Sequence, residues 1–134
     1  MALLSKEELL KNGKTLPTKV IEVPEWGGEV TIRCLTGAER DRYEASLARL
    51  DRKTGAMVPN LVNSRARLVA MSIVDETGKR MFSDDDILEL GGTSSIALTR
   101  VWVAACQLSG ISEAEVEAAA EDFDEIQSED SSEG

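Results

Sequence analysis

Apolar residues recur at helical spacing in several segments, and residues that begin helices precede most of these segments. Serine or threonine followed three residues later by glutamate, the capping box that opens helices, occurs at Ser5, Thr36 and Ser112. Polar first turns and apolar stripes mark the other starts. We therefore expect six helices, at residues 5 to 13, 36 to about 50, 60 to about 74, 83 to 91, 94 or 95 to 110, and 112 to about 120.

The same pattern predicts which side chains the helices bury. Tyr43, Leu47 and Leu50 recur at helical spacing in the second segment. Val62, Ala66, Val69 and Ile73 form the stripe of the third segment, and Leu98, Val101, Trp102, Ala105 and Leu108 form that of the most apolar segment. We expect these stripes to build the core.

One region changes from helical to alternating periodicity. Residues 20–23 and 29–35 are rich in β-branched residues and flank a Pro-Glu-Trp-Gly-Gly loop at 24–28, which predicts a hairpin. A hairpin alone is marginal in water, so this one has to lie on helices or pair with another chain's edge. Whether residues 72–76 also pair with residues 79–82 stays open at the level of sequence.

These elements predict a mainly α fold, a compact bundle of five to six short helices with one small β-hairpin. A chain of 134 residues fits one domain. We place this domain at residues 1–120, with the hairpin at about 20–35 and an exposed, mobile loop at 51–59. Residues 121–134, rich in acids and serines, bury too little to order themselves and are expected to form a disordered tail.

The negative charge of the chain is unevenly distributed. The formal net charge is −10, and residues 121–134 hold seven acidic residues and no basic one. The other 120 residues carry 18 acids and 15 bases, a nearly balanced surface without the basic cluster that nucleic acid requires. The tail is either a solvated solubility segment or a docking segment that orders on a basic partner. In the second case Asp124, Glu125, Glu129 and Asp130 are its candidate contacts.

The side chains offer little chemistry for an active site. The chain has no histidine, and it has neither of the glycine-rich loops that cradle phosphates. The acidic run at 84–86 follows Ser83 and is interpreted as a capped helix start. Cys34 and Cys106 lack activating neighbours and are interpreted as reduced, partly buried apolar residues. We expect no catalytic residue, cofactor or metal, and therefore a protein that binds other proteins.

Trp26 is the candidate contact residue of the hairpin. A tryptophan at the end of such a loop either folds back on its own domain or meets a partner, and the sequence favours neither alternative. Trp26, Gly27 and Gly28 are the predicted contacts. No export signal or membrane-length apolar stretch occurs in the sequence, which predicts a soluble, cytoplasmic protein.

Four segments together resemble the tail assembly chaperone family of long-tailed, lambda-like bacteriophages and prophages. They are LLSKEELL at 3–10, VIEVPEWGGEVTIRCLTGAERDRYEASL at 20–47, NSRARLVAMSIVDETGKRMFSDDDILELG at 63–91 and LTRVWVAACQLSGISEAEVE at 98–117. The resemblance covers residues 1 to about 120. None of the segments is a catalytic signature, so the resemblance rests on their order and combination.

The resemblance implies a role and a set of partners. Such proteins hold the long, hydrophobic tape measure protein soluble in the host cytoplasm until tube subunits polymerise around it, and they are absent from the mature virion. A longer product of ribosomal frameshifting is thought to recruit the tail tube protein, and some members assemble into rings. A structural head-tail or tail virion protein and a small acidic regulatory module are the alternatives.

Overall fold

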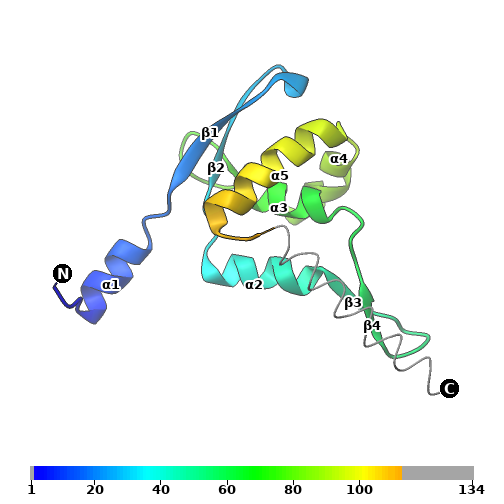
Figure 1. Ribbon diagram of the computed structural model, residues 1–134, viewed down its shortest axis with the longest axis horizontal. Helices are drawn as coiled ribbons and strands as arrows, with labels where there is room; N and C mark the ends of the chain where they lie inside the picture. Colours follow the sequence, from blue (N-terminus) through cyan, green and yellow to red (C-terminus); the bar gives the residue numbers. More distant parts are fainter. Residues whose placement is uncertain (1, 113–134) are drawn as a thin grey trace.

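The computed structural model describes residues 2–112 of the chain. Its elements, in chain order, are α1 Lys6–Gly13, β1 Thr18–Val23, a 3₁₀ turn Pro24–Trp26, β2 Gly28–Arg33, α2 Gly37–Ser46, β3 Ala48–Leu50, β4 Met57–Pro59, α3 Ser64–Ser72, β5 Ile73–Val74, a 3₁₀ turn Asp84–Asp86, α4 Ile87–Gly91 and α5 Ser95–Ser109. Figure 1 shows α5 lying beside the long β1–β2 hairpin and against α3, while α1 and the β3–β4 hairpin project from this body.

The predicted hairpin forms and becomes part of a three-stranded sheet of order β1-β2-β5. Strands β1 and β2 are antiparallel in the register Ile21↔Val30, and Gly27 supplies the left-handed φ of 77° that closes the turn between them. On the other side of β2, Ile32 pairs with Ile73. The hairpin thus avoids marginal stability by gaining a third strand and by packing on α5.

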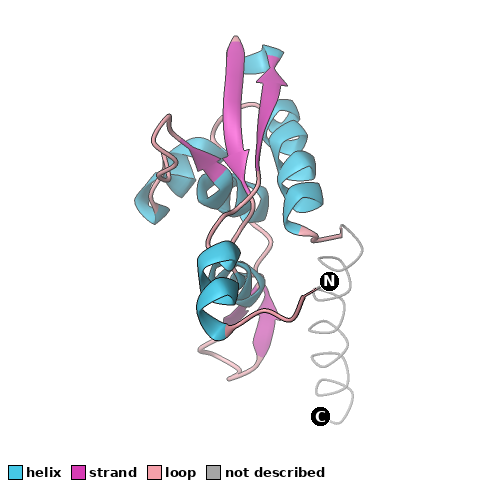
Figure 2. Cartoon of the chain, turned by 90° about the vertical axis from the view of Figure 1, so that its left-hand side faces the viewer, coloured by secondary structure: helices cyan, strands magenta, loops and turns pink. Residues whose placement is uncertain are grey.

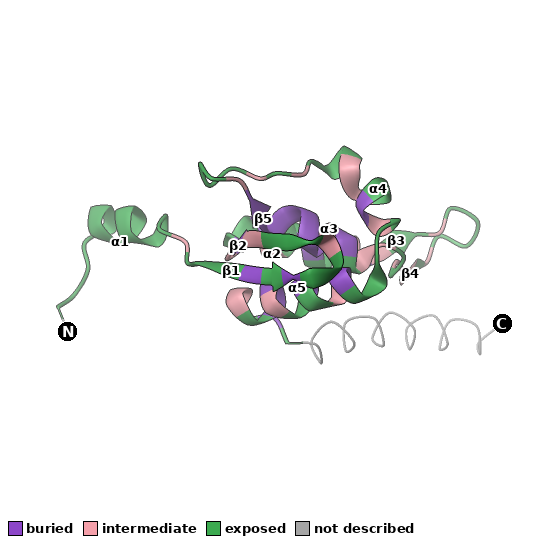
Figure 3. Ribbon diagram, turned by 90° about the horizontal axis from the view of Figure 1, so that it is seen from above, coloured by how far each residue is buried: buried purple, intermediate pink, exposed green. Residues whose placement is uncertain are grey.

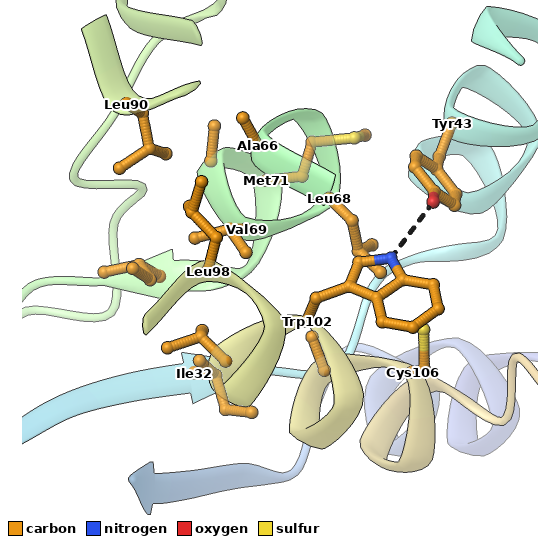
Figure 4. Packing of buried hydrophobic residues seen from close by; sticks show 14 of the residues in the cluster. Ile32, Tyr43, Ala66, Leu68, Val69, Met71, Leu90, Leu98, Trp102 and Cys106 are labelled. Carbon is orange, nitrogen blue, oxygen red and sulfur yellow. Dashed lines mark hydrogen bonds between the residues drawn. The ribbon is translucent and has the colours of Figure 1, made fainter. Parts of the chain in front are cut away.

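The core lies where the sheet, α3 and α5 meet (Figure 4). Ile32, Leu68 and Val101 are fully buried there. Trp102 is also buried, and its indole Nε1 donates a hydrogen bond to the Tyr43 hydroxyl at 3.3 Å, which satisfies a polar atom inside the core. Burial raises the pKa of Tyr43 above its ordinary value, so the phenol stays protonated.

Three predicted helix starts, at Ser5, Thr36 and Ser94, are confirmed within the described residues, whereas the helix expected near Asn60 begins at Ser64. The Ser5, Thr36 and Ser94 side chains each accept a hydrogen bond from the backbone N–H three residues later. At Thr36 the box is complete, because the Glu39 carboxylate accepts from the Thr36 N–H at 2.9 Å. Glu39 also receives both hydrogen bonds of the Arg33 guanidinium, which joins α2 to the end of β2.

The predicted fold is confirmed in part: five helices and the first hairpin are present in the described residues, but the fold is mixed α+β with two sheets and not a helical bundle with a single hairpin. The helix expected to run to about Leu50 ends at Ser46, and the expected loop at 51–59 lies within a second hairpin, β3–β4. Its turn is closed by hydrogen bonds between Asp51 and the Gly55 and Ala56 backbone. Figure 2 shows this small sheet apart from the larger one.

Two predicted core residues consequently lie outside the core. Leu50 belongs to β3 and is 58% exposed, and Val62 precedes α3 and is 77% exposed. Ile73 is buried as expected, although it lies in β5 and not in a helix. The other stripes pack as expected, with Leu47 buried at the end of α2 and Leu98 buried in α5.

The open question at 72–82 is settled by backbone hydrogen bonds. The Met81 N–H donates to the Ile73 carbonyl at 3.1 Å, and Val74 bridges Arg80 in antiparallel fashion. The Asp75 carboxylate fixes the turn by accepting from the backbone N–H groups of Thr77 and Lys79. The helix expected from 112 to about 120 and the acidic tail lie outside the described residues.

Candidate partner-binding surface

The N-terminal arm, defined here as residues 2–13, carries apolar side chains that the body does not cover. Helix α1 buries no residue. Leu3, Leu4, Leu9 and Leu10 are between 50% and 99% exposed. Figure 3 shows the arm set apart from the buried centre. An exposed cluster of four leucines is unfavourable in water, and such clusters mark surfaces that meet other macromolecules.

Trp26 folds back onto its own domain at the end of the hairpin. The indole is half-buried and packs against the core, and its Nε1 is buried without a hydrogen-bond partner. Behind it lies an open cleft of about 410 Å³. The residues that line this cleft, apolar except for two acids and a threonine, are Trp26, Met81, Phe82, Asp86, Glu89, Leu90 and Thr93.

An ion pair holds the Trp26 loop against α5. Arg100 donates two hydrogen bonds to the Glu25 carboxylate, at 2.7 and 3.2 Å. The hydrogen bond from Arg100 lowers the pKa of Glu25, so this carboxylate is ionised at neutral pH. Gly27 and Gly28 stay exposed at the end of the loop. The loop therefore forms a fixed rim beside the cleft, and the contact role of Trp26, Gly27 and Gly28 stays a prediction.

The hairpin surface, defined here as Arg49, Leu50, Arg52, Lys53 and Met57, is basic and apolar. Leu50 and Met57 are cross-strand partners, 58% and 41% exposed. The three cations are exposed, and their side chains form no hydrogen bond or ion pair with another residue of 2–112. This surface could not be predicted from the sequence, because the pattern at residues 51–59 is that of a mobile loop.

Arg67 of α3 clamps the base of this hairpin to the body. Its guanidinium donates to the backbone carbonyls of Ser46, Asn60 and Val62 at 3.2, 2.5 and 2.8 Å, and to the Ser46 hydroxyl at 3.1 Å. Burial lowers the pKa of Arg67 from its ordinary value. Because that value is far above neutral pH, the guanidinium stays cationic. Arg67 thus joins the base of the hairpin to α3, beside the hydrogen bonds that Asn60 donates to the Ser46 and Leu47 carbonyls.

The described residues bring together no set of groups for bond-making chemistry. Asp84, Asp85 and Asp86 begin a helical turn, and the Asp86 carboxylate caps it through the Ser83 N–H at 2.8 Å. Within residues 2–112 no three potential metal-binding side chains gather. Cys106 is buried and Cys34 is half-buried, and neither forms a disulfide. No helix in that range is long and apolar enough to cross a bilayer. Asp124, Glu125, Glu129 and Asp130 lie outside the described residues.

Comparisons with known proteins point to one family. The model of the family described as phage tail assembly chaperone matches residues 6–124. The solved structure of the bacteriophage HK97 tail assembly chaperone is similar in fold, with a TM-score of 0.53 at 17% sequence identity, over 81% of this chain and 100% of that one. No curated protein matches the chain. Because the family model spans most of its length, this chain belongs to the phage tail assembly chaperone family.

Proposed function

We propose that this chaperone binds the tape measure protein of its phage and keeps it soluble in the host cytoplasm until the tail tube forms. Family membership makes it a tail assembly chaperone, and the resemblance described above names the tape measure as the protein held. The structural feature that best supports this is the N-terminal arm, whose leucines are exposed and whose helix buries nothing. A long hydrophobic helical protein is the chemical partner that such leucines fit.

The arm is suited to transient holding. Its helix is defined by the Ser5 cap and not by packing, so it can reorient to meet an apolar surface without disturbing the core. The Trp26 cleft supplies a second apolar contact with a rigid rim. Two separated sites on one chain allow several weak contacts along an extended partner, which together bind more tightly than either one.

The proposal includes the assembly in which the chaperone acts. Self-association into a ring or another homo-oligomer would repeat the arm around an elongated partner. A longer frameshifted form would recruit the tail tube protein, and the chaperone would leave before the virion is complete. These three points rest on the resemblance.

Co-expression tests the central claim. A fragment of the cognate tape measure protein is expressed alone and with the full chain, and the soluble fraction of the fragment is measured. We expect the fragment to be soluble only with the chaperone. The variant Leu9→Glu/Leu10→Glu should lose this effect, because it places charge where the apolar contact forms. The matched control Lys6→Gln/Lys11→Gln makes the same change in net charge on the same helix and should retain it.

Two outcomes would contradict the proposal. Equal precipitation of the fragment with and without the chaperone would remove the tape measure as partner. Detection of the chain by mass spectrometry in purified virions, at a constant number of copies per particle, would instead indicate a structural tail protein.

A further inference from the structure

The charge of the molecule divides sharply at the end of the described residues. Residues 113–134 hold ten acidic and no basic residues, so the fifteen acids of residues 1–112 balance all fifteen bases of the chain. Within the body, residues 45–74 hold five bases (Arg49, Arg52, Lys53, Arg65 and Arg67) and one acid (Asp51). The only strongly acidic segment and the most basic segment thus belong to the same chain.

The hairpin surface presents the part of this positive charge that has no partner among the described residues. Arg67 is engaged by backbone carbonyls, and Arg65 lies over the Trp102 ring and bonds the Thr99 hydroxyl. Arg49, Arg52 and Lys53 have no such contacts. The hairpin is a two-stranded sheet of three-residue strands, and a ribbon of this kind gains stability when another segment covers it.

The hairpin and the acidic segment also both carry apolar side chains. Leu50 and Met57 form an exposed cross-strand pair next to the cationic turn. Phe123 and Ile126 are the large apolar residues of 121–134; Phe123 lies between Asp122 and Asp124, and Ile126 follows Glu125. A segment that alternates acids with two apolar residues can pair its carboxylates with the cations and cover the Leu50–Met57 pair in the same contact.

The distance from the end of α5 to the β3–β4 hairpin is short. The Ser109 hydroxyl accepts a hydrogen bond from the Leu35 N–H at 2.9 Å, so the end of α5 lies at the start of α2. Strand β3 begins two residues after α2 ends (Figure 1). Ten helical residues span about 15 Å, whereas 22 extended residues reach about 70 Å. Residues 113–134 can therefore reach the hairpin of their own chain.

We propose that residues 113–134 dock on the hairpin surface of the same molecule. Arg49, Arg52 and Lys53 meet Asp124, Glu125, Glu129 and Asp130, while Phe123 and Ile126 cover Leu50 and Met57. In this arrangement the acidic segment is an internal competitor for any acidic partner of the hairpin. The inference uses charge and geometry alone and does not depend on the tape measure as partner.

Zero-length cross-linking of the full chain tests the contact. A carbodiimide joins the Lys53 amine to a carboxylate only when the two groups touch. The chain has no base after Arg100, so trypsin releases residues 101–134 as one peptide and mass spectrometry identifies its cross-links directly. We expect a cross-link from Lys53 to residues 121–134, formed at low ionic strength and suppressed at high salt, because exposed ion pairs are screened.

Variants separate docking from chance proximity. Arg49→Glu/Arg52→Glu keeps the reporting amine of Lys53 and should reduce the cross-link several-fold. The matched control Lys11→Glu/Lys14→Glu makes the same change in charge on exposed residues in and directly after the arm and should leave the cross-link unchanged. Leu50→Ser/Met57→Ser should also weaken the cross-link if the apolar pair is covered.

Mixing isotope-labelled and unlabelled chains distinguishes one molecule from two. Cross-linked peptides that carry a single isotope composition support docking within the chain. Mixed peptides would show that the segment binds a neighbouring copy and would overturn the proposal. No cross-link at Lys53, or equal loss in both charge variants, would overturn it too.

Discussion

The body and the two projections of this molecule are built by different forces. In the body, α3, α5 and the sheet bring together residues far apart in sequence, such as Ile32, Leu68 and Val101, and bury them fully. In the N-terminal arm no residue of the helix is buried, and the arm is held by a local cap. The β3–β4 hairpin is intermediate, since its base is fixed by hydrogen bonds of Arg67 and Asn60.

This difference indicates that stability comes from the buried body and that binding is a property of the exposed projections. Because the buried core is stable without them, the apolar side chains of the projections can stay exposed and accessible to a partner. The same type of residue therefore has opposite consequences in the two regions. A buried leucine contributes to the free energy of unfolding, whereas an exposed leucine contributes to binding.

Matched leucine substitutions should give the largest contrast. Leu68→Ala leaves a cavity in the fully buried core and should lower the free energy of unfolding by about 2–5 kcal/mol. Leu9→Ala on the arm should change it by less than about 0.5 kcal/mol, because Leu9 is 54% exposed and alanine favours helix. Urea denaturation measures both. Similar losses would show that the arm packs on the body.

Removing the clamp should separate the hairpin from the body. Arg67→Ala removes the guanidinium donor from the carbonyls of Asn60 and Val62 and one of the two donors from the Ser46 carbonyl, and should cost about 1–3 kcal/mol. Amide hydrogen exchange should become faster in the hairpin and stay slow in α5. Arg67→Lys should not restore protection, because an ammonium cannot reproduce the planar set of donors. Uniform acceleration across the molecule would mean that Arg67 supports the whole core.

The turn after β5 should give the smallest effect, through pH. The Thr77 hydroxyl, and then the Thr77 and Lys79 N–H groups, lower the pKa of Asp75. A lowered carboxyl pKa contributes stability that is present above the ordinary aspartate range and is lost as pH falls through the folded-state pKa. Thr77→Val should raise the pKa of Asp75 toward its ordinary value, as followed by carboxyl ¹³C shifts. The difference in stability between the wild-type chain and the variant should shrink with acidification. An unchanged Asp75 titration in Thr77→Val would contradict this assignment.

Local chemistry explains what could be predicted. The caps at Ser5, Thr36 and Ser94, the glycine turn after Trp26 and the apolar stripe of α5 each depend on neighbours within a few residues, so they can be read from the chain. The family resemblance, carried by ordered segments, is confirmed by the family match over residues 6–124. The predicted contacts Trp26, Gly27 and Gly28, the acidic contacts and the domain limits stay predictions.

The sequence by itself determined where most helices begin, that the first hairpin forms, and that most of the net negative charge gathers in residues 121–134. Only the tertiary structure decided that residues 48–59 form a ribbon, because that depends on Arg67 reaching three carbonyls from another helix. It also decided that Ile73 serves as a strand residue, because Ile32 offers a free edge across the fold. Periodicity reports the immediate neighbours of a residue, whereas pairing and clamping depend on partners distant in sequence.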